Sequence, residues 1–595
     1  MAVLGRWCTS ALFGGALLAL GTLFGCAVAT SDEGSARTDE RPPAGAQSVG
    51  GASSTGGISS TGGASNPAPS SSFGGHASST GGTSSGSIAT PATSGTPASS
   101  SGGAASEDST SGGSANAGDQ YQAPGSNPFV YTAHDPLSTF AADVDTASYD
   151  IFRRDIQLGN LPVPASVRLE EYVNYFGYDY PAPAQDSEAP FAIHLAAAQS
   201  LSKDSTVLLR VGIQGQLAPP SEKRPANLVF LVDTSGSMQS ADKLPLVQQV
   251  LSDTIDILAP TDTIAIVSYA GSTAVRLPPT PASQADRIRA VISDLNAGGS
   301  TAGAAGLTLA YEQAAAGFLE GGINHIVLCT DGDFNVGPSS TAELLALVRS
   351  QRNTGVTLTT LGFGVGNLND AMMETVSDAG NGIYGFISDS AQAHSYVQNK
   401  MLSTLVHIAK DMKIQVEFNP SQVAAYRLLG YENRAIADVD FRNDVVDAGE
   451  VGSGHRVTAL YQLVLAGGEI PARDGAPAAD DGEPYGGVTE VAADDLVLVK
   501  VRYKDPTATD ADPAAEVAAS LRATADFAET MSADFAWAAA VATFAEVLKK
   551  SPYADPSALD AVETLVNDPL IANRSDRIEF ATLFATARGL LASAP

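Results

Sequence analysis

The spacing of apolar residues changes along this chain, and each spacing predicts a different kind of structure. Between residues 225 and 410, short apolar runs alternate with longer segments in which apolar residues recur every three or four positions. The short runs are typical of buried strands and the longer segments of helices. Strands are expected at 227–232, 263–269, 325–330, 357–363 and 383–387, with an edge strand at 275–277. Helices are expected at 243–258, 284–295, 303–318, 341–354, 369–379 and 391–409. This alternation predicts an α/β domain with a doubly wound, mostly parallel sheet.

The segments on both sides of this domain favour antiparallel strands. Apolar residues alternate with period two after residue 411, and two strand-like segments also precede the domain. The predicted strands lie at 191–195, 206–213, 412–418, 456–464 and 496–503. Neither set makes a sheet comfortably by itself, so we expect the two sets to form one β-sandwich with the α/β domain inserted between them. Helices are expected to follow at 515–531, 533–550, 557–566 and 575–592.

The first part of the chain predicts export and a flexible tether. Arg6 precedes an apolar run at 11–20 that is too short to span a membrane, as in a secretory signal. The string Leu23-Phe-Gly-Cys26 resembles a bacterial lipobox, which makes residues 1–26 a lipoprotein signal peptide and Cys26 the lipidated residue. The alternative is an ordinary signal with an accidental cysteine. Residues 27–126 are rich in Gly, Ser and Thr and contain almost no large apolar residues, so a disordered linker is expected.

These patterns divide the chain into six regions. The boundaries are 1–26 for the signal peptide, 27–126 for the linker, 127–224 for an N-terminal region of helices then strands, 225–410 for the α/β domain, 411–512 for a β-rich domain and 513–595 for a C-terminal helical region.

Oxygen-bearing side chains follow the ends of two predicted strands. Asp233, Ser235 and Ser237 come at alternate positions directly after the first strand, and Asp331 follows the strand at 325–330. Thr301 stands just before the helix at 303–318. Open α/β sheets bind ligands at the carboxyl ends of their strands, and such oxygen ligands suit a hard cation such as Mg²⁺.

The order DxSxS, Thr, TDG resembles the metal-ion-dependent adhesion site of von Willebrand factor type A domains. That resemblance implies that Ser235 and Ser237 bind the cation directly and that Thr301 binds it directly or through water. Asp233 and Asp331 are implied to act mostly through water. The expected cation is Mg²⁺, with Mn²⁺ and Ca²⁺ as alternatives.

Longer strings resemble the bacterial YfbK-like family of proteins with a type A domain. They include Asp143-Val-Asp-Thr-Ala-Ser-Tyr149, Val167-Arg-Leu-Glu-Glu-Tyr-Val-Asn-Tyr-Phe176, Thr330-Asp-Gly-Asp-Phe-Asn-Val-Gly337 and Tyr426-Arg-Leu-Leu-Gly-Tyr-Glu-Asn-Arg434. The resemblance covers roughly residues 127–591. It implies the architecture more than the mechanism, because the role of this family is poorly defined.

Charge and motifs narrow the function. A formal charge of −32 argues against nucleic acid, which needs clustered Lys and Arg. No HExxH, GxSxG, GxxxxGK[ST] or CxxC motif is present, and His325, His407, His455 and Cys329 are expected to be structural, so no enzymatic activity is expected.

Two hypotheses of function remain. In the first, the type A domain binds an Asp or Glu of a protein partner through the metal ion. In the second, it has a structural or assembly role in the cell envelope without metal-gated binding. The membrane is expected to be contacted only through the lipid anchor, and Ala27 after Cys26 favours the outer membrane.

Overall fold

The computed structural model describes residues 118–593 apart from 143, 203, 218–223, 302, 333–340, 402–405, 445–447, 481, 509–511 and 524–530. The predicted signal peptide, Cys26 and most of the predicted linker lie outside the described residues. All described residues belong to one compact unit, Ser106–Pro595.

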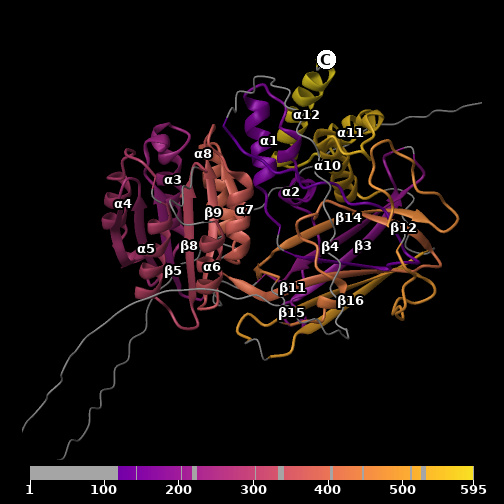
Figure 1. Cartoon of the computed structure of the whole chain (residues 1–595), viewed down its shortest axis with the longest axis horizontal. Helices are drawn as coiled ribbons and strands as arrows, with labels where there is room; N and C mark the ends of the chain where they lie inside the picture. Colours follow the sequence, from indigo (N-terminus) through magenta and orange to yellow (C-terminus); the bar gives the residue numbers. More distant parts are fainter. Residues whose placement is uncertain are drawn as a thin grey trace, which may run out of the picture. The chain divides into compact units, whose positions relative to one another are not determined.

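The α/β domain is built on a six-stranded sheet in the order β10-β9-β8-β5-β6-β7. Figure 1 labels the neighbouring strands β5, β8 and β9 of this sheet. Its strands are β5 (Ala226–Asp233), β6 (Thr263–Tyr269), β7 (Thr273–Pro281), β8 (Ile323–Thr330), β9 (Val356–Phe363) and β10 (Tyr384–Ile387). All neighbours pair in parallel except β6 and β7, so β7 is an antiparallel edge strand. The predicted doubly wound sheet is confirmed.

Helices cover both faces of this sheet because residues along each strand point alternately to either side. On β5, Leu228 and Phe230 pack with one group of helices, whereas Val229 and Leu231 pack with the other. The first group is α3 (Leu244–Ile257), α4 (Ala285–Ser293) and α8 (Ser390–Tyr396). The second is α5 (Gly303–Ala316), α6 (Thr341–Arg352) and α7 (Asp370–Ala379).

Two further sheets form the predicted sandwich, and strands from both sides of the α/β domain share one of them. That sheet has the order β1-β12-β14-β4-β3, and the second has the order β13-β11-β15-β16 with β2 paired to β11. In the first of these sheets, β3 (Phe191–Gln199) and β4 (Val207–Gly215) precede the α/β domain in the chain. Strand β4 pairs with β14 (Arg456–Leu465), which follows the α/β domain. The other strands are β1 (Val130–Tyr131), β2 (Leu137–Ala141), β11 (His407–Phe418), β12 (Val423–Leu429), β13 (Glu450–Gly452), β15 (Asp495–Lys504) and β16 (Ala515–Arg522). The insertion of the α/β domain into a sandwich is therefore confirmed.

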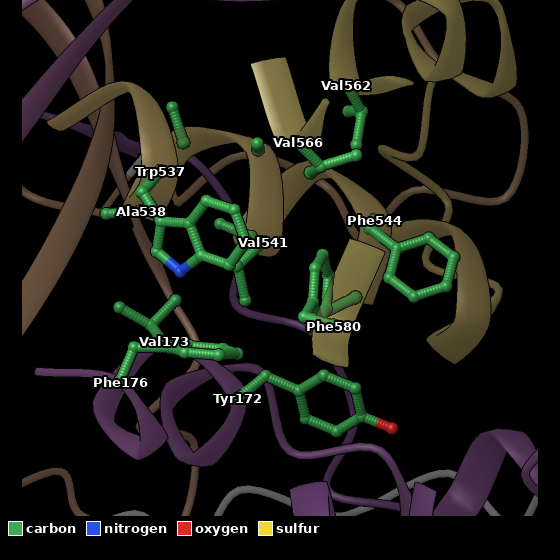
Figure 2. Close-up of a cluster of buried hydrophobic side chains, with 14 of the residues drawn as sticks. Tyr172, Val173, Phe176, Trp537, Ala538, Val541, Phe544, Val562, Val566 and Phe580 are labelled. Carbon is green, nitrogen blue, oxygen red and sulfur yellow. The ribbon is translucent and has the colours of Figure 1, made fainter. Parts of the chain in front are cut away.

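Helices from the two ends of the described chain share a third core. The N-terminal helices are α1 (Ala147–Gln157) and α2 (Leu169–Tyr175), and the C-terminal ones are α10 (Ala533–Lys549), α11 (Leu559–Val566) and α12 (Ser575–Ser593). Aromatic rings from both sets meet in it, including Phe176, Trp537 and Phe580 (Figure 2). The C-terminal region is thus packed against residues that lie about 400 positions earlier in the chain.

Three expectations about element boundaries are wrong. The predicted helix at 515–531 is strand β16 over residues 515–522, because pairing with β15 overrides the helical propensity of its alanines, and the β-rich domain therefore extends past residue 512. The predicted helix at 391–409 ends at Tyr396, followed by a π-helical turn (Val397–Met401), and β11 already begins at His407. The predicted linker reached residue 126, but residues 119–121 are docked on the α/β domain by hydrogen bonds.

Membrane crossing by a helix finds no support among the described residues. None of the helices there is both long and apolar enough to span a bilayer.

Candidate metal centre

Four of the five predicted ligands lie at one edge of the parallel sheet. Asp233 is the last residue of β5, and Asp331 directly follows its neighbour β8. Ser235 and Ser237 belong to the 3-10 turn that follows β5 (Gly236–Gln239, with Ser235 at its N-cap). Because β5 and β8 are parallel, their carboxyl ends meet at the same edge, as expected.

The two serine hydroxyls lie side by side, each next to a buried carboxylate. Their Oγ atoms are 3.0 Å apart. The side chain of Ser235 is within hydrogen-bonding reach of Asp233, and that of Ser237 is within reach of Asp331. A hydroxyl that gives its proton to a carboxylate keeps its oxygen lone pairs for another partner.

Asp233 is fixed in this turn by further hydrogen bonds. The backbone N of Ser235 donates to its Oδ1 over 2.8 Å, and Oγ1 of Thr330 donates to its Oδ2 over 3.1 Å. Burial raises the pKa of Asp233 to about 6, against these hydrogen bonds, and the nearby charge of Asp331 adds to the rise.

Asp331 is held by two residues that the sequence did not single out. Nζ of Lys243 donates to its Oδ2 over 2.8 Å, and Nδ2 of Asn367 donates to the same oxygen over 3.3 Å. Burial acts to raise the pKa of Asp331, but the hydrogen bonds from Lys243 and Ser237 and the charge of Lys243 outweigh it and hold the pKa below its ordinary value.

A positional signal for Asn367 was present in the sequence. It follows the end of β9, which is the neighbour of β8, so it belongs to the same edge of the sheet. Lys243, at the start of α3, carried no comparable signal.

Thr301 lies in a loop that is hydrogen-bonded to the serine turn. The backbone N of Gly236 donates to the oxygen of Gly299 over 3.1 Å, and the N of Gly298 donates to the oxygen of Thr234 over 2.8 Å. These two bonds hold the loop next to Ser235 at Gly299, which lies two residues before Thr301. Thr301 is half-buried, and Ser300 and Gly236 are exposed, so the edge opens to solvent on this side.

The residues present fit a hard divalent cation. Octahedral Mg²⁺ binds oxygens at 2.0–2.1 Å, which places neighbouring ligand oxygens about 2.9 Å apart. The two serine oxygens match this spacing at 3.0 Å. The donor set consists of hydroxyl and carboxylate oxygens and contains no sulfur or imidazole, as Mg²⁺ prefers.

Another acidic group with metal-like spacing already has positive partners. Oxygens of Asp145, Glu171 and Glu374 lie within 4.8 Å of one another, and all three residues are buried. Arg434 reaches Asp145 at 2.7 Å, and Arg168 reaches Glu374 at 2.7 Å and Glu171 at 3.4 Å. Two guanidinium groups thus supply the charge that an ion would supply, and we interpret the group as an ion-pair network.

Two residues predicted to be structural are indeed buried in the sheet of the α/β domain. His325 is 1% exposed and its Nδ1 is 2.7 Å from Oγ1 of Thr357, and burial lowers its pKa to about 3. Cys329 is fully buried, and burial raises the pKa of its thiol.

Comparison with known proteins agrees with this architecture. The chain is 42% identical over 396 residues to the "Uncharacterized protein YfbK" of Escherichia coli (strain K12), a match that covers 65% of this chain and 68% of that protein. The chain belongs to the YfbK family. The family description "Uncharacterized protein YfbK, C-terminal" matches residues 403–590, and "von Willebrand factor type A domain" matches residues 227–400. A third description, "von Willebrand factor", matches residues 115–210. Domains of the type A class suggest protein interaction or adhesion and commonly bind a divalent metal.

Solved structures with weaker similarity include a von Willebrand factor type A protein from Catenulispora acidiphila. It is 16% identical with a TM-score of 0.39, and the match covers 69% of this chain and 89% of that chain. The ArnB paralog VWA2 from Sulfolobus acidocaldarius is 14% identical with a TM-score of 0.35, over 68% of this chain and 98% of that chain.

Proposed function

We propose that this YfbK-family protein is a binding module of the cell envelope whose type A domain captures an acidic residue of a protein partner through a divalent cation. Asp233, Ser235, Ser237, Thr301 and Asp331 hold the cation, which is Mg²⁺, with Mn²⁺ and Ca²⁺ as alternatives. The observation that supports this most is the pair of serine oxygens 3.0 Å apart, each next to a buried carboxylate.

The chemistry of this edge explains why the partner residue is acidic. The ligands expected to bind the cation directly are neutral hydroxyls, so a bound Mg²⁺ keeps excess positive charge and at least one water. A partner Asp or Glu that replaces this water gains a direct charge contact. The open side near Gly236 and Ser300 gives the partner access.

Anchoring by lipid at Cys26, at the outer membrane, and the absence of enzymatic activity belong to the same proposal. They rest on the sequence pattern, on the type A domain and on the family. The protein then contacts the membrane only through its lipid, and its strongly negative charge keeps nucleic acid from binding.

A second candidate function is structural, and one observation favours it. Arg168, which precedes α2, forms ion pairs with Asp370 and Glu374 of α7, and Arg434 of the β-rich domain pairs with Asp378 of α7 at 2.7 Å. These links, of which those of Arg168 are buried, fix the type A domain within the rest of the protein. An assembly role without metal-gated binding is therefore the alternative.

Calorimetric titration with Mn²⁺ and capture from envelope extract separate the two. The wild type is expected to bind Mn²⁺, and Ser235→Ala is expected to lose at least about 10-fold in affinity, because even residues around the direct ligands typically cost 10–100-fold. Capture of the partner is expected in Mg²⁺ and not in chelator, and not by folded Ser235→Ala.

Ser293→Ala is the matched control, since Ser293 is an exposed serine at the end of α4. It is expected to behave as the wild type. Capture that is indifferent to chelator, or unchanged in folded Ser235→Ala, would support the structural role instead.

A further inference from the structure

The first described residues of the chain are docked on a loop of the candidate metal centre. Residues 119–121, here called the strap, run along the loop 364–369, which joins β9 to α7. The backbone N of Gln120 donates to the oxygen of Leu368 over 2.7 Å, and the N of Asp370 donates to the oxygen of Gln120 over 3.2 Å. The described part of the chain therefore begins at this loop.

Asp119 provides the side-chain part of this docking. Its Oδ1 accepts from the backbone N of Gly366 over 2.9 Å and from that of Leu368 over 3.1 Å. Its other oxygen is paired with Arg154 of α1 at 3.0 Å, and the two side chains are 1% and 3% exposed. A carboxylate that accepts two backbone N–H groups and pairs with a buried arginine is held firmly in one geometry.

Tyr121 and Arg154 complete the contact from the other side. The hydroxyl of Tyr121 donates to Asp119 over 3.1 Å, and Arg154 donates to the same hydroxyl over 3.1 Å. Arg154 also reaches the oxygen of Gly364 at 3.5 Å. The strap is thus bonded both to the 364–369 loop and to α1.

The opposite side of the same loop touches the candidate metal centre. Between the two residues bonded to Asp119 stands Asn367, whose Nδ2 donates to Oδ2 of Asp331. A Cβ on Gly332 would lie 2.5 Å from the backbone N of Asn369, so the backbone after Asp331 packs directly on this loop. The side chain of Lys243, which also binds Asp331, passes closely over Gly364.

We propose that Asp119 is a positioning residue for the cation site. Docking of the strap fixes the 364–369 loop with Asn367 against Asp331, so cation binding and strap docking strengthen each other. The proposal rests on the proposed function, because it concerns the regulation of that same site. Anything that pulls the strap off the loop then weakens cation binding, and through it the capture of an acidic partner.

The coupling is reciprocal by thermodynamic necessity. If strap docking raises the cation affinity by some factor, cation binding must raise the stability of the docked strap by the same factor. Cation binding is therefore expected to slow amide exchange at Gly366 and Leu368, whose N–H groups bond to Asp119. If the strap only packs on the fold and is not coupled to the cation site, cation binding should leave the exchange of these amides unchanged.

The test uses the full-length chain and Mn²⁺ alone as the probe. Calorimetry is expected to show that Asp119→Ala binds Mn²⁺ about 10-fold more weakly than the wild type, the usual size for residues that orient ligands. Asp119→Asn keeps one accepting oxygen, so its Mn²⁺ affinity is expected to lie between those of the wild type and Asp119→Ala. Amide exchange of residues 364–369 is expected to slow with Mn²⁺ in the wild type and to respond less in Asp119→Ala.

A double-mutant cycle shows whether the effect passes through Asn367. In an Asn367→Ala background, Asp119→Ala is expected to cause little further loss of Mn²⁺ affinity. Asp560→Ala, which removes an exposed partner of Arg588, is the control and is expected to bind Mn²⁺ as the wild type does.

The possible failures are distinguishable. If the wild type binds no Mn²⁺, the proposed function fails and the coupling fails with it. If the wild type binds Mn²⁺ and Asp119→Ala and Asp119→Asn bind it equally well, only the coupling is overturned. If Asp119→Ala lowers the Mn²⁺ affinity equally in the wild-type and the Asn367→Ala background, the effect of Asp119 does not pass through Asn367.

Discussion

Nζ of Lys243 donates to Oδ2 of Asp331 over 2.8 Å, and the two side chains are only 7% and 0% exposed. One of the two carboxylates of the candidate metal centre is thus already partly neutralised by the protein itself. Asp233, at the end of β5, has hydroxyl and N–H donors instead. An incoming cation therefore meets one carboxylate that is paired with a lysine and one that, among the described residues, has hydrogen-bond donors but no cationic partner.

Lys243→Met is expected to destabilise the fold and to increase its response to metal. Removing one partner of a buried pair leaves an uncompensated charge and costs about 3–5 kcal/mol. Asp331 then depends on a cation for neutralisation, so Mn²⁺ should raise the melting temperature of the variant more than that of the wild type. Scanning calorimetry with and without Mn²⁺ measures both effects, and equal Mn²⁺-induced shifts would contradict the prediction.

Arg168→Met is expected to loosen the type A domain from the N-terminal helices. Arg168 is 1% exposed and pairs with Asp370 and Glu374 of α7 and with Glu171 of α2. Its loss leaves buried carboxylates without their partner and is expected to cost about 3–5 kcal/mol in unfolding free energy. Denaturant unfolding provides the measurement.

Arg588→Met is the matched control for that experiment. Arg588 pairs with carboxylates as well, those of Asp560 and Glu563, but these side chains are 84% and 51% exposed. Exposed pairs contribute little to stability, so the control is expected to unfold nearly as the wild type does. If both variants lose the same stability, the network around Arg168 is not what holds α7.

The sequence was informative where burial alone decides the structure. The apolar runs of β5, β6, β8 and β9 are buried on both faces, and their positions agree with the structure to within two residues. Four candidate site residues, Asp233, Ser235, Ser237 and Asp331, come together because strand ends in a parallel sheet share one edge.

The sequence was uninformative where contacts with residues far away in the chain decide the structure. Residues 515–522 contain three alanines and a leucine and favour a helix locally, but their pairing with β15 makes them a strand. Asp119 sits in a polar segment with no periodicity, and its role depends on N–H groups about 250 positions away. No local pattern encodes such contacts.

Asp150 predicts a specific pH dependence of stability. Burial raises its pKa to about 7, against the attraction of Arg153 and Lys400. As the pH rises, the Asp150 carboxyl of the unfolded chain loses its proton near its ordinary pKa of about 3.9, whereas that of the folded state keeps its proton until about pH 7. This stabilising contribution is complete below about pH 3.9 and is lost as the pH rises toward 7.

Asp150→Asn removes this contribution and retains an oxygen that can accept from Gln392. Relative to the wild type, the unfolding free energy of the variant is expected to rise by about 1.4 kcal/mol per pH unit between pH 4.5 and 6.5. This difference should level off above pH 7. Denaturant unfolding of both proteins across this range gives the difference directly. A difference that does not change with pH would show that Asp150 is ionised throughout.

Cys26→Ser is expected to release the protein from the membrane. Cys26 ends the lipobox-like string after the apolar run, and lipidation there is the proposed means of anchoring. Fractionation and labelling with a fatty acid compare the variant with the wild type. A wild type that is already soluble and unlabelled would show that the segment is an ordinary signal.

Phe580 of α12 tests whether the C-terminal helices are part of the core of the protein. Its fully buried ring lies 5.3 Å from that of Trp537 and 5.5 Å from that of Phe176, centroid to centroid (Figure 2). Phe580→Ala is expected to cost about 3–5 kcal/mol in unfolding free energy, because it removes a large ring and leaves a cavity. Fluorescence of Trp537 follows the unfolding, since the only other tryptophan is Trp7 in the predicted signal peptide.

Ile578→Ala is the control on the same helix, because Ile578 is 58% exposed. Its effect is expected to stay within about 0.5 kcal/mol, as is usual for surface positions. Phe580→Ala should also weaken the packing of α2, which carries Tyr172 and Val173 into the same cluster. Because Arg168 precedes α2 and pairs with α7, the loss should extend to the type A domain and appear as a lower cooperativity of unfolding. Equal stability of the two variants would mean that the C-terminal helices are a dispensable addition to the fold.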